Sequence, residues 1–268
     1  MANKRFESAL YLNLGKNHCH VRLKHALHAI NQEQIAYRYQ PTLGPLVEQT
    51  CRMRHLKIGL QDLEWMKKQA ESTREKIEEA GSDCKLFSAD LENPGDSVEM
   101  MKQVLSEFPD LDLLVHNASV FDESPLASDD EEVFDRQFDV NFKSPFFMTQ
   151  MYINHCTSGH VVNILDTKIQ SNRARRFTAY NLSKKALMHL TKMAALDFAP
   201  EFRFNGIAPG PVLRASHASE EEFHQRIQET PLKQEIPGHS IASALNYLIE
   251  NPNLTGQILY CDNGAHLN

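Results

Sequence analysis

From about residue 66 onward, the sequence alternates amphipathic helix patterns with short apolar runs of strand length. The helix patterns cover residues 66–80, 94–107, 131–154 and 180–198, and the strand patterns cover residues 84–89, 111–116, 160–165, 203–207 and 257–260. Strands that alternate with helices require right-handed crossovers and a mostly parallel sheet with helices on both faces. The sequence therefore predicts a doubly wound α/β fold with three layers, α/β/α, in which ligands bind beyond the carboxyl ends of the strands.

Composition narrows the class of partner. The formal net charge of −7 and the pI of about 6.0 disfavour the basic face that nucleic acid or an anionic membrane requires. No stretch reaches the roughly 18 apolar residues of a membrane span. The five cysteines are odd in number and form no CxxC pair, so neither a disulfide framework nor a metal site is indicated. We expect a cytoplasmic protein whose partner is a small molecule.

The spacing Tyr180-Asn-Leu-Ser-Lys184 carries the most chemistry. Residues four apart on a helix share one face, and a nearby ammonium favours the phenolate, which lowers a tyrosine pKa from about 10. The pattern alone is common, so its context decides. Asp166 directly follows the predicted strand 160–165, where its side chain is expected to enter the ligand crevice.

Polar or turn residues follow the other predicted strands as well. Asp90 ends the strand 84–89, Asn117-Ala118-Ser119 follows the strand 111–116, and Pro209-Gly210 follows the strand 203–207. Because parallel strands end at one edge of a sheet, these residues are expected to surround one crevice.

The order of these segments, with Leu91 after Asp90 and Asn141 in the helix 131–154, resembles the short-chain dehydrogenases/reductases. The closing segment Thr255–Gly264 is similar to the last strand of that family, and the resemblance extends over about residues 84–267. Asp166 stands where most members have a serine, and this aspartate together with Phe121 resembles the pteridine and dihydromonapterin reductases.

This resemblance implies a Rossmann-like fold and an NADPH-dependent reduction of a dihydropterin-type substrate, with NADH as the other possible cofactor. In the catalytic set, Tyr180 would donate the proton, Lys184 would lower the pKa of Tyr180 and bind the nicotinamide ribose, Asp166 would relay a proton, and Asn141 would hold a water and the helix geometry. The implied cofactor contacts are Gly44, Asp90, Leu91, Asn117, Ala118, Ser119, Tyr180, Lys184, Pro209 and Gly210. The implied substrate contacts are Ser119, Phe121, Asp166 and Tyr180, with Phe121 stacking on the flat substrate.

The amino-terminal part departs from the family pattern of three glycines after the first strand. Counting back from the helix 66–80 predicts the second strand near 60–63, the first strand at 35–38 and the phosphate loop at 39–46, where only Gly44 remains. The predicted Rossmann domain is then 35–268, and residues 1–34 form an extension or an extra strand-helix element. A second register places the first strand and loop at 9–15 instead.

The degenerate loop leaves other functions open. One alternative is a catalytically silent binding or regulatory protein that kept the reductase fold. Another is a reductase of a different carbonyl or imine substrate. The resemblance further implies a homotetramer or homodimer that assembles through the helices around Asn141 and Tyr180.

Overall fold

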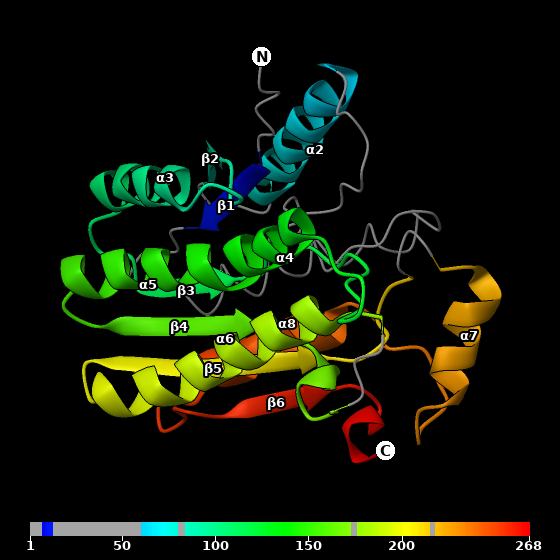
Figure 1. Ribbon diagram of the computed structural model, residues 1–268. Coiled ribbons are helices and arrows are strands. Elements are labelled where there is room, and N and C mark those ends of the chain that lie inside the picture. The colour runs from blue at the N-terminus through cyan, green and yellow to red at the C-terminus, as the bar shows by residue number, and fades with distance from the viewer. Residues whose placement is uncertain (1–6, 13–59, 80–83, 173–175, 215–217) are drawn as a thin grey trace.

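The computed structural model describes residues 7–12, 60–79, 84–172, 176–214 and 218–268 (Figure 1). The strands are β1 (Glu7–Leu12), β2 (Cys84–Ala89), β3 (Leu113–His116), β4 (Gly159–Ile164), β5 (Phe202–Pro209) and β6 (Ile258–Cys261). The α-helices are α2 (Leu60–Glu79), α3 (Pro94–Glu107), α4 (Glu131–Phe138), α5 (Ser144–His155), α6 (Thr178–Asp197), α7 (Glu220–Gln228) and α8 (His239–Glu250). Short helical turns occupy Asp139–Lys143, Thr167–Ile169 and Ala265–Leu267.

A parallel sheet of order β3-β4-β5-β6 forms the centre of the molecule. Neighbouring strands pair in register, with Val161 opposite both Leu114 and Phe204. Because the four strands run the same way, their carboxyl ends lie at one edge of the sheet (Figure 1). The four strands predicted at these positions are confirmed, with ends shifted by a few residues.

The two faces of the sheet are buried under different helices. In β4, Val161 packs into a core with α3 and α5, whereas Val162 packs into a second core with α8. Both side chains are fully buried, and burial of a valine of this kind stabilises a fold by about 1.5–3 kcal/mol. Adjacent residues of β4 therefore point to opposite faces of the sheet, and each packs against the helices on its own face. This is the three-layer arrangement that the sequence predicts.

The predicted long helix 131–154 is interrupted. A π-helical turn at Asp139–Lys143 separates α4 from α5, and Pro145 follows in the first turn of α5. Proline is tolerated there because the first amide groups of a helix have no partner within the helix. The predicted helix 131–154 is therefore two α-helices joined by this turn.

Two predictions for the amino-terminal part are wrong. Residues 60–63, predicted as a strand, begin the helix α2; the segment Leu60–Gln69 contains no β-branched residue, and most of its residues favour helix. In addition, β2 does not join the parallel sheet in the described part of the chain but pairs with β1 in an antiparallel two-stranded sheet. A period-two pattern predicts a strand, but it does not choose the strand's partner. The predicted strand 35–38 and the loop with Gly44 lie outside the described residues.

Two helices were not anticipated. A capping box begins α7, in which the Ser219 hydroxyl and the Glu222 carboxylate each accept from the other residue's backbone amide. The helix α8 buries Ile241, Leu245 and Leu248, which recur at helical spacing. A search of the described helices for one long and apolar enough to cross a membrane finds none.

Candidate active site

Tyr180 and Asp166 meet at the carboxyl end of β4. Asp166 follows this strand and caps the short 3₁₀ turn Thr167–Ile169, where its side chain accepts the amide hydrogen of Lys168. Tyr180 lies in the first turn of α6, where its side chain is buried, and its hydroxyl donates to Oδ2 of Asp166 across 2.9 Å. Lys184, one turn later, is also buried, and its Nζ donates to the carbonyl of Ile164 across 2.9 Å. The structure thus brings Asp166, Tyr180 and Lys184 to the same strand end.

The pKa of Tyr180 moves in the direction opposite to the one expected. Burial raises this pKa well above its usual value, and the charge and hydrogen bond of the Asp166 carboxylate raise it further. The hydroxyl of Ser119, which is also hydrogen-bonded to Tyr180, lowers it and only partly offsets those effects. The expectation that Lys184 makes this tyrosine acidic is wrong for the protein alone, because desolvation and a neighbouring carboxylate both disfavour the phenolate.

Asn141 connects the loop after β3 to α6. The π-helical turn places its fully buried side chain against Val120, whose amide donates to Oδ1 across 2.9 Å and whose carbonyl accepts from Nδ2 across 3.0 Å. The same Nδ2 lies 3.2 Å from Oε1 of Gln137 and 3.2 Å from Oγ of Ser183. Asn141 therefore fixes the backbone of the segment that contains Ser119 and Phe121.

Asn117 and Gly210 lie at the carboxyl ends of two strands of the sheet. Oδ1 of Asn117 is buried and has no hydrogen-bond partner among the described residues. A buried unsatisfied polar atom of this kind costs about 1–3 kcal/mol, which a donor from a ligand would offset. At the end of β5, a Cβ added to Gly210 would lie 2.7 Å from Cα of Asp262, so the two backbones approach as closely as glycine permits.

The remaining predicted cofactor contacts are distributed as follows. Asp90 lies in the turn after β2, where its carboxylate accepts the amide hydrogen of Glu92 across 3.0 Å. Leu91 is buried, and its carbonyl accepts from the hydroxyl of Ser144 across 2.8 Å. Ala118 is half-buried after β3, and Pro209 is the last residue of β5. Gly44 belongs to the loop outside the described residues.

Phe121 is the centre of an aromatic cluster that the sequence did not indicate. Its ring stacks on Phe177 with centroids 4.2 Å apart and planes 18° from parallel, and it meets the edge of Tyr180 at 4.5 Å. Backbone hydrogen bonds on either side of Phe177, between Ser124 and residues 176 and 178, hold this segment in place. Phe177 thus already occupies one face of Phe121, so a flat substrate has only the remaining surface of that ring.

Asp262, in the segment after β6, anchors the turn that follows Asp166. Its carboxylate accepts from the hydroxyl of Thr167 and from the backbone and ring nitrogens of His266. Burial raises the pKa of Asp262, but the hydrogen bonds from Thr167 and His266 outweigh burial, so the pKa is lower than usual. The position of Asp262 within the closing segment was noted in the sequence, but this contact was not foreseen.

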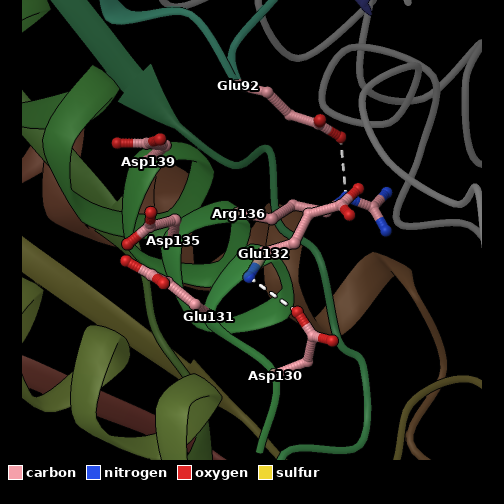
Figure 2. A pocket seen from close by; sticks show the side chains of 7 residues that line it. All are labelled: Glu92, Asp130, Glu131, Glu132, Asp135, Arg136 and Asp139. Carbon is pink, nitrogen blue, oxygen red and sulfur yellow. Dashed lines mark hydrogen bonds and ion pairs between the residues drawn. The ribbon is translucent and has the colours of Figure 1, made fainter.

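A surface hollow of about 540 Å³ lies on the outer side of α4, apart from these residues (Figure 2). It is lined by Glu92, Asp130, Glu131, Glu132, Asp135, Arg136 and Asp139. Arg136 is almost fully buried and forms ion pairs with Glu92 at 2.6 Å and with Asp122 at 2.8 Å.

Among the described residues, no group of three or more His, Cys, Asp or Glu side chains could hold a metal ion.

Comparison with known proteins identifies the family. The model of the enoyl-(acyl carrier protein) reductase family, which belongs to the short-chain dehydrogenases/reductases, matches residues 51–266. The chain is a short-chain dehydrogenase/reductase. This confirms the Rossmann-like α/β fold and the expectation of an NAD(P)H-dependent reductase.

Relatives within the short-chain dehydrogenases/reductases are diverse. An uncharacterised oxidoreductase of Mycobacterium tuberculosis is 31% identical over 72% of this chain and 77% of its own length. A glucose and ribitol dehydrogenase of Daucus carota is 31% identical over 75% of this chain and 73% of its own length. Among solved structures, the FolM alternative dihydrofolate reductase 1 of Brucella canis, complexed with NADP, has a TM-score of 0.71 and 32% identity, and the match covers 75% of this chain and 80% of that one.

Proposed function

We propose that this short-chain reductase uses NADPH to reduce a dihydropterin-type substrate. The observation that carries the proposal is the hydrogen bond from the Tyr180 hydroxyl to Asp166. Most members of the family have a serine at the position of Asp166, and the pteridine-reducing branch has an aspartate. The structural neighbour from Brucella canis, whose name describes a dihydrofolate reductase, supports the same substrate class.

The described residues fit the dinucleotide. Asn117 would offer its unpartnered Oδ1 to the adenosine half, with Asp90, Leu91, Ala118 and Ser119 beside it. Lys184 would hold the nicotinamide ribose, while Pro209 and Gly210 would border the nicotinamide. When bound, the cofactor supplies the hydride. The preference for NADPH over NADH is supported by the NADP in the Brucella canis structure.

The state of Tyr180 suits reduction. Burial raises the pKa of Tyr180, so the phenol holds its proton at neutral pH, and its acidity would have to increase in the bound complex for that proton to reach the substrate nitrogen. Asp166 orients the hydroxyl and would relay the proton that replaces it. Asn141 would act at a distance by holding the loop of Ser119 and Phe121.

Turnover provides the test. Purified protein is mixed with NADPH and dihydrobiopterin, dihydromonapterin or dihydrofolate, and NADPH absorbance is followed; Tyr180→Phe serves as the catalytic control. We expect oxidation of NADPH that this variant abolishes. The absence of turnover with all three pterins, under conditions in which a known reductase works, would refute the proposal. Activity with simple ketones or quinones alone would instead show the carbonyl reductase alternative.

We also propose a homotetramer or homodimer that assembles through α5 and α6. Leu182, Met193 and Leu196 are exposed on α6 at helical spacing, with His189 between them on the same stripe. Light scattering measures the assembly, and Leu196→Glu is expected to shift it toward the monomer.

The three described cysteines are unpaired, which supports a reducing, cytoplasmic location. Residues 1–34 and 35–268 remain our proposed division of the chain.

A further inference from the structure

Lys168 holds a half-buried ammonium group directly above the proposed substrate site. It lies in the turn after Asp166, and its own amide donates to Oδ1 of Asp166 across 2.7 Å, which fixes the backbone of the turn. Its Nζ lies 4.9 Å from the ring centroid of Phe121 and 4.9 Å from that of Phe177. Lys168 therefore shares the wall of the site with the residue expected to stack on the substrate.

The ammonium of Lys168 lacks an anionic partner. No described residue accepts a hydrogen bond from its Nζ or forms an ion pair with it, so its contacts there are the two aromatic rings. A cation over an aromatic ring gains about 0.5–2 kcal/mol, less than a charge-assisted hydrogen bond to a buried carboxylate can supply. The group is thus partly withdrawn from water without the compensation that a buried charge usually has.

The charges of other residues act on the Lys168 ammonium. Burial lowers the pKa of Lys168, the charge of Asp166 opposes this, and the guanidinium groups of Arg226 and Arg176 lower it further. Arg176 is paired with Glu123. Arg226 is half-buried on α7, a helix that stands beyond the carboxyl ends of β4 and β6 (Figure 1), and it has no ion pair within the described part of the chain.

The nearby carboxylates are all engaged elsewhere. Asp166 accepts from the Tyr180 hydroxyl and from the amide of Lys168, and Glu123 accepts from Arg176. Glu222 accepts from the amide of Ser219 in the capping box of α7. None of them forms an ion pair with Lys168, and an incoming anion would do so.

We propose that Lys168, whose ammonium lies over Phe121 and Phe177, binds a carboxylate carried by the substrate, so that the preferred substrate is a flat ring with an anionic side chain. This inference rests on the proposed pterin reduction and deepens it. The ring would lie beside Phe121 and Tyr180, and the side chain would extend past Lys168 toward α7. An anion at this place restores the pairing that the ammonium lacks, and a neutral side chain does not.

The test compares two pterins on the NADPH-loaded enzyme. Dihydrofolate carries carboxylates on its side chain, and dihydrobiopterin carries only hydroxyls. We expect wild type to favour dihydrofolate in kcat/KM, and Lys168→Gln to reduce the ratio of the two kcat/KM values about tenfold, which corresponds to about 1.4 kcal/mol. Arg226→Gln is expected to act in the same direction. The matched control, Lys192→Gln, removes an exposed lysine of α6 and should leave the ratio at the wild-type value.

The outcomes separate this inference from the proposed function. Turnover of both pterins with an unchanged ratio in Lys168→Gln overturns the anion site and leaves pterin reduction standing. If neither pterin is reduced, titration calorimetry of folate and biopterin still decides: tighter binding of folate that Lys168→Gln abolishes supports the anion site, and equal or absent binding overturns it.

Discussion

The hydroxyl of Tyr180 donates its hydrogen to Oδ2 of Asp166 at 2.9 Å. The hydroxyl that would donate a proton in the proposed reduction is therefore directed at a carboxylate at the end of β4. Burial is the largest cause of the raised pKa of Tyr180, and Asp166 raises it further because a carboxylate stabilises the phenol and repels the phenolate.

Asp166→Asn and Ser119→Ala are expected to shift the alkaline limb of the pH–rate profile in opposite directions. The Asp166→Asn variant would lack the charge that raises the pKa of Tyr180, so the tyrosine would ionise, and activity would fall, at a lower pH than in wild type. Removal of the Ser119 hydroxyl takes away a contact that lowers this pKa, so the limb should move to higher pH. The measurement is kcat/KM against pH for all three proteins. Shifts of both variants in the same direction would contradict the assignment.

Tyr180→Phe should fold normally and lose most of its activity. The ring keeps its packing against Phe121, and only the hydroxyl is lost. General acid catalysis by a positioned side chain contributes about 10²–10⁴-fold, so kcat should fall within that range. Thermal melting with and without NADPH provides the control, since a variant that still gains stability from the nucleotide has an intact site. A decrease of less than tenfold would point to another proton donor.

Two buried histidines should make the fold less stable in mild acid. Burial lowers the pKa of His116 to about 3, helped by Lys184, and lowers that of His160 to about 3, helped by Arg203. The unfolded chain binds these protons near pH 6.5 and the folded chain does not, so each contribution is complete above pH 6.5 and declines as the pH falls toward 3. Between pH 7 and pH 5 the loss is about 2 kcal/mol for each histidine.

Urea unfolding at pH 7 and pH 5 measures this loss, and a His160→Gln variant should lose less between the two values than wild type. Stability that does not change over this interval in wild type would show that these histidines are protonated in the folded protein.

Arg136 should matter far more to stability than an exposed lysine on the same helical segment. Arg136→Met leaves the buried carboxylate of Asp122 and the partly buried Glu92 without their partner, which costs about 3–5 kcal/mol. Lys143→Met breaks a half-exposed pair with Asp139, for which about 1 kcal/mol or less is expected. Chemical unfolding of the two variants gives the comparison. Equal losses would mean that the ion pairs of Arg136 are screened by solvent.

Much of the sheet and part of the site could be predicted from the sequence, because both depend on local patterns. Runs such as 160–165 are short, largely apolar and rich in β-branched residues, which favours strands that are buried on both faces of a parallel sheet. Asp166 and Tyr180, both expected at one crevice, are hydrogen-bonded because residues at strand ends and on the facing helix lie at the same end of the sheet. The α7 helix could have been found from Ser219 and Glu222, whose spacing is that of a capping box.

The features that were missed depend on contacts between distant residues. The stacking of Phe177 on Phe121 results from hydrogen bonds between Ser124 and the neighbours of Phe177, which no spacing along the chain indicates. The direction of the Tyr180 pKa shift required knowledge of burial and of the contact with Asp166, both of which raise this pKa. The pairing of β2 with β1 joins segments more than seventy residues apart, so the pattern within each strand could not reveal it.

The π-helical turn at Asp139–Lys143 also limits how the length of this chain can vary in evolution. Deletion of one residue there would allow a regular α-helix in which Met148 and Tyr152 keep their place in the core, but the wider turn that contains Asn141 would be lost. Asn141 would then lose its contacts with Val120. Homologues that keep the site should therefore show substitutions in this turn but no insertions or deletions.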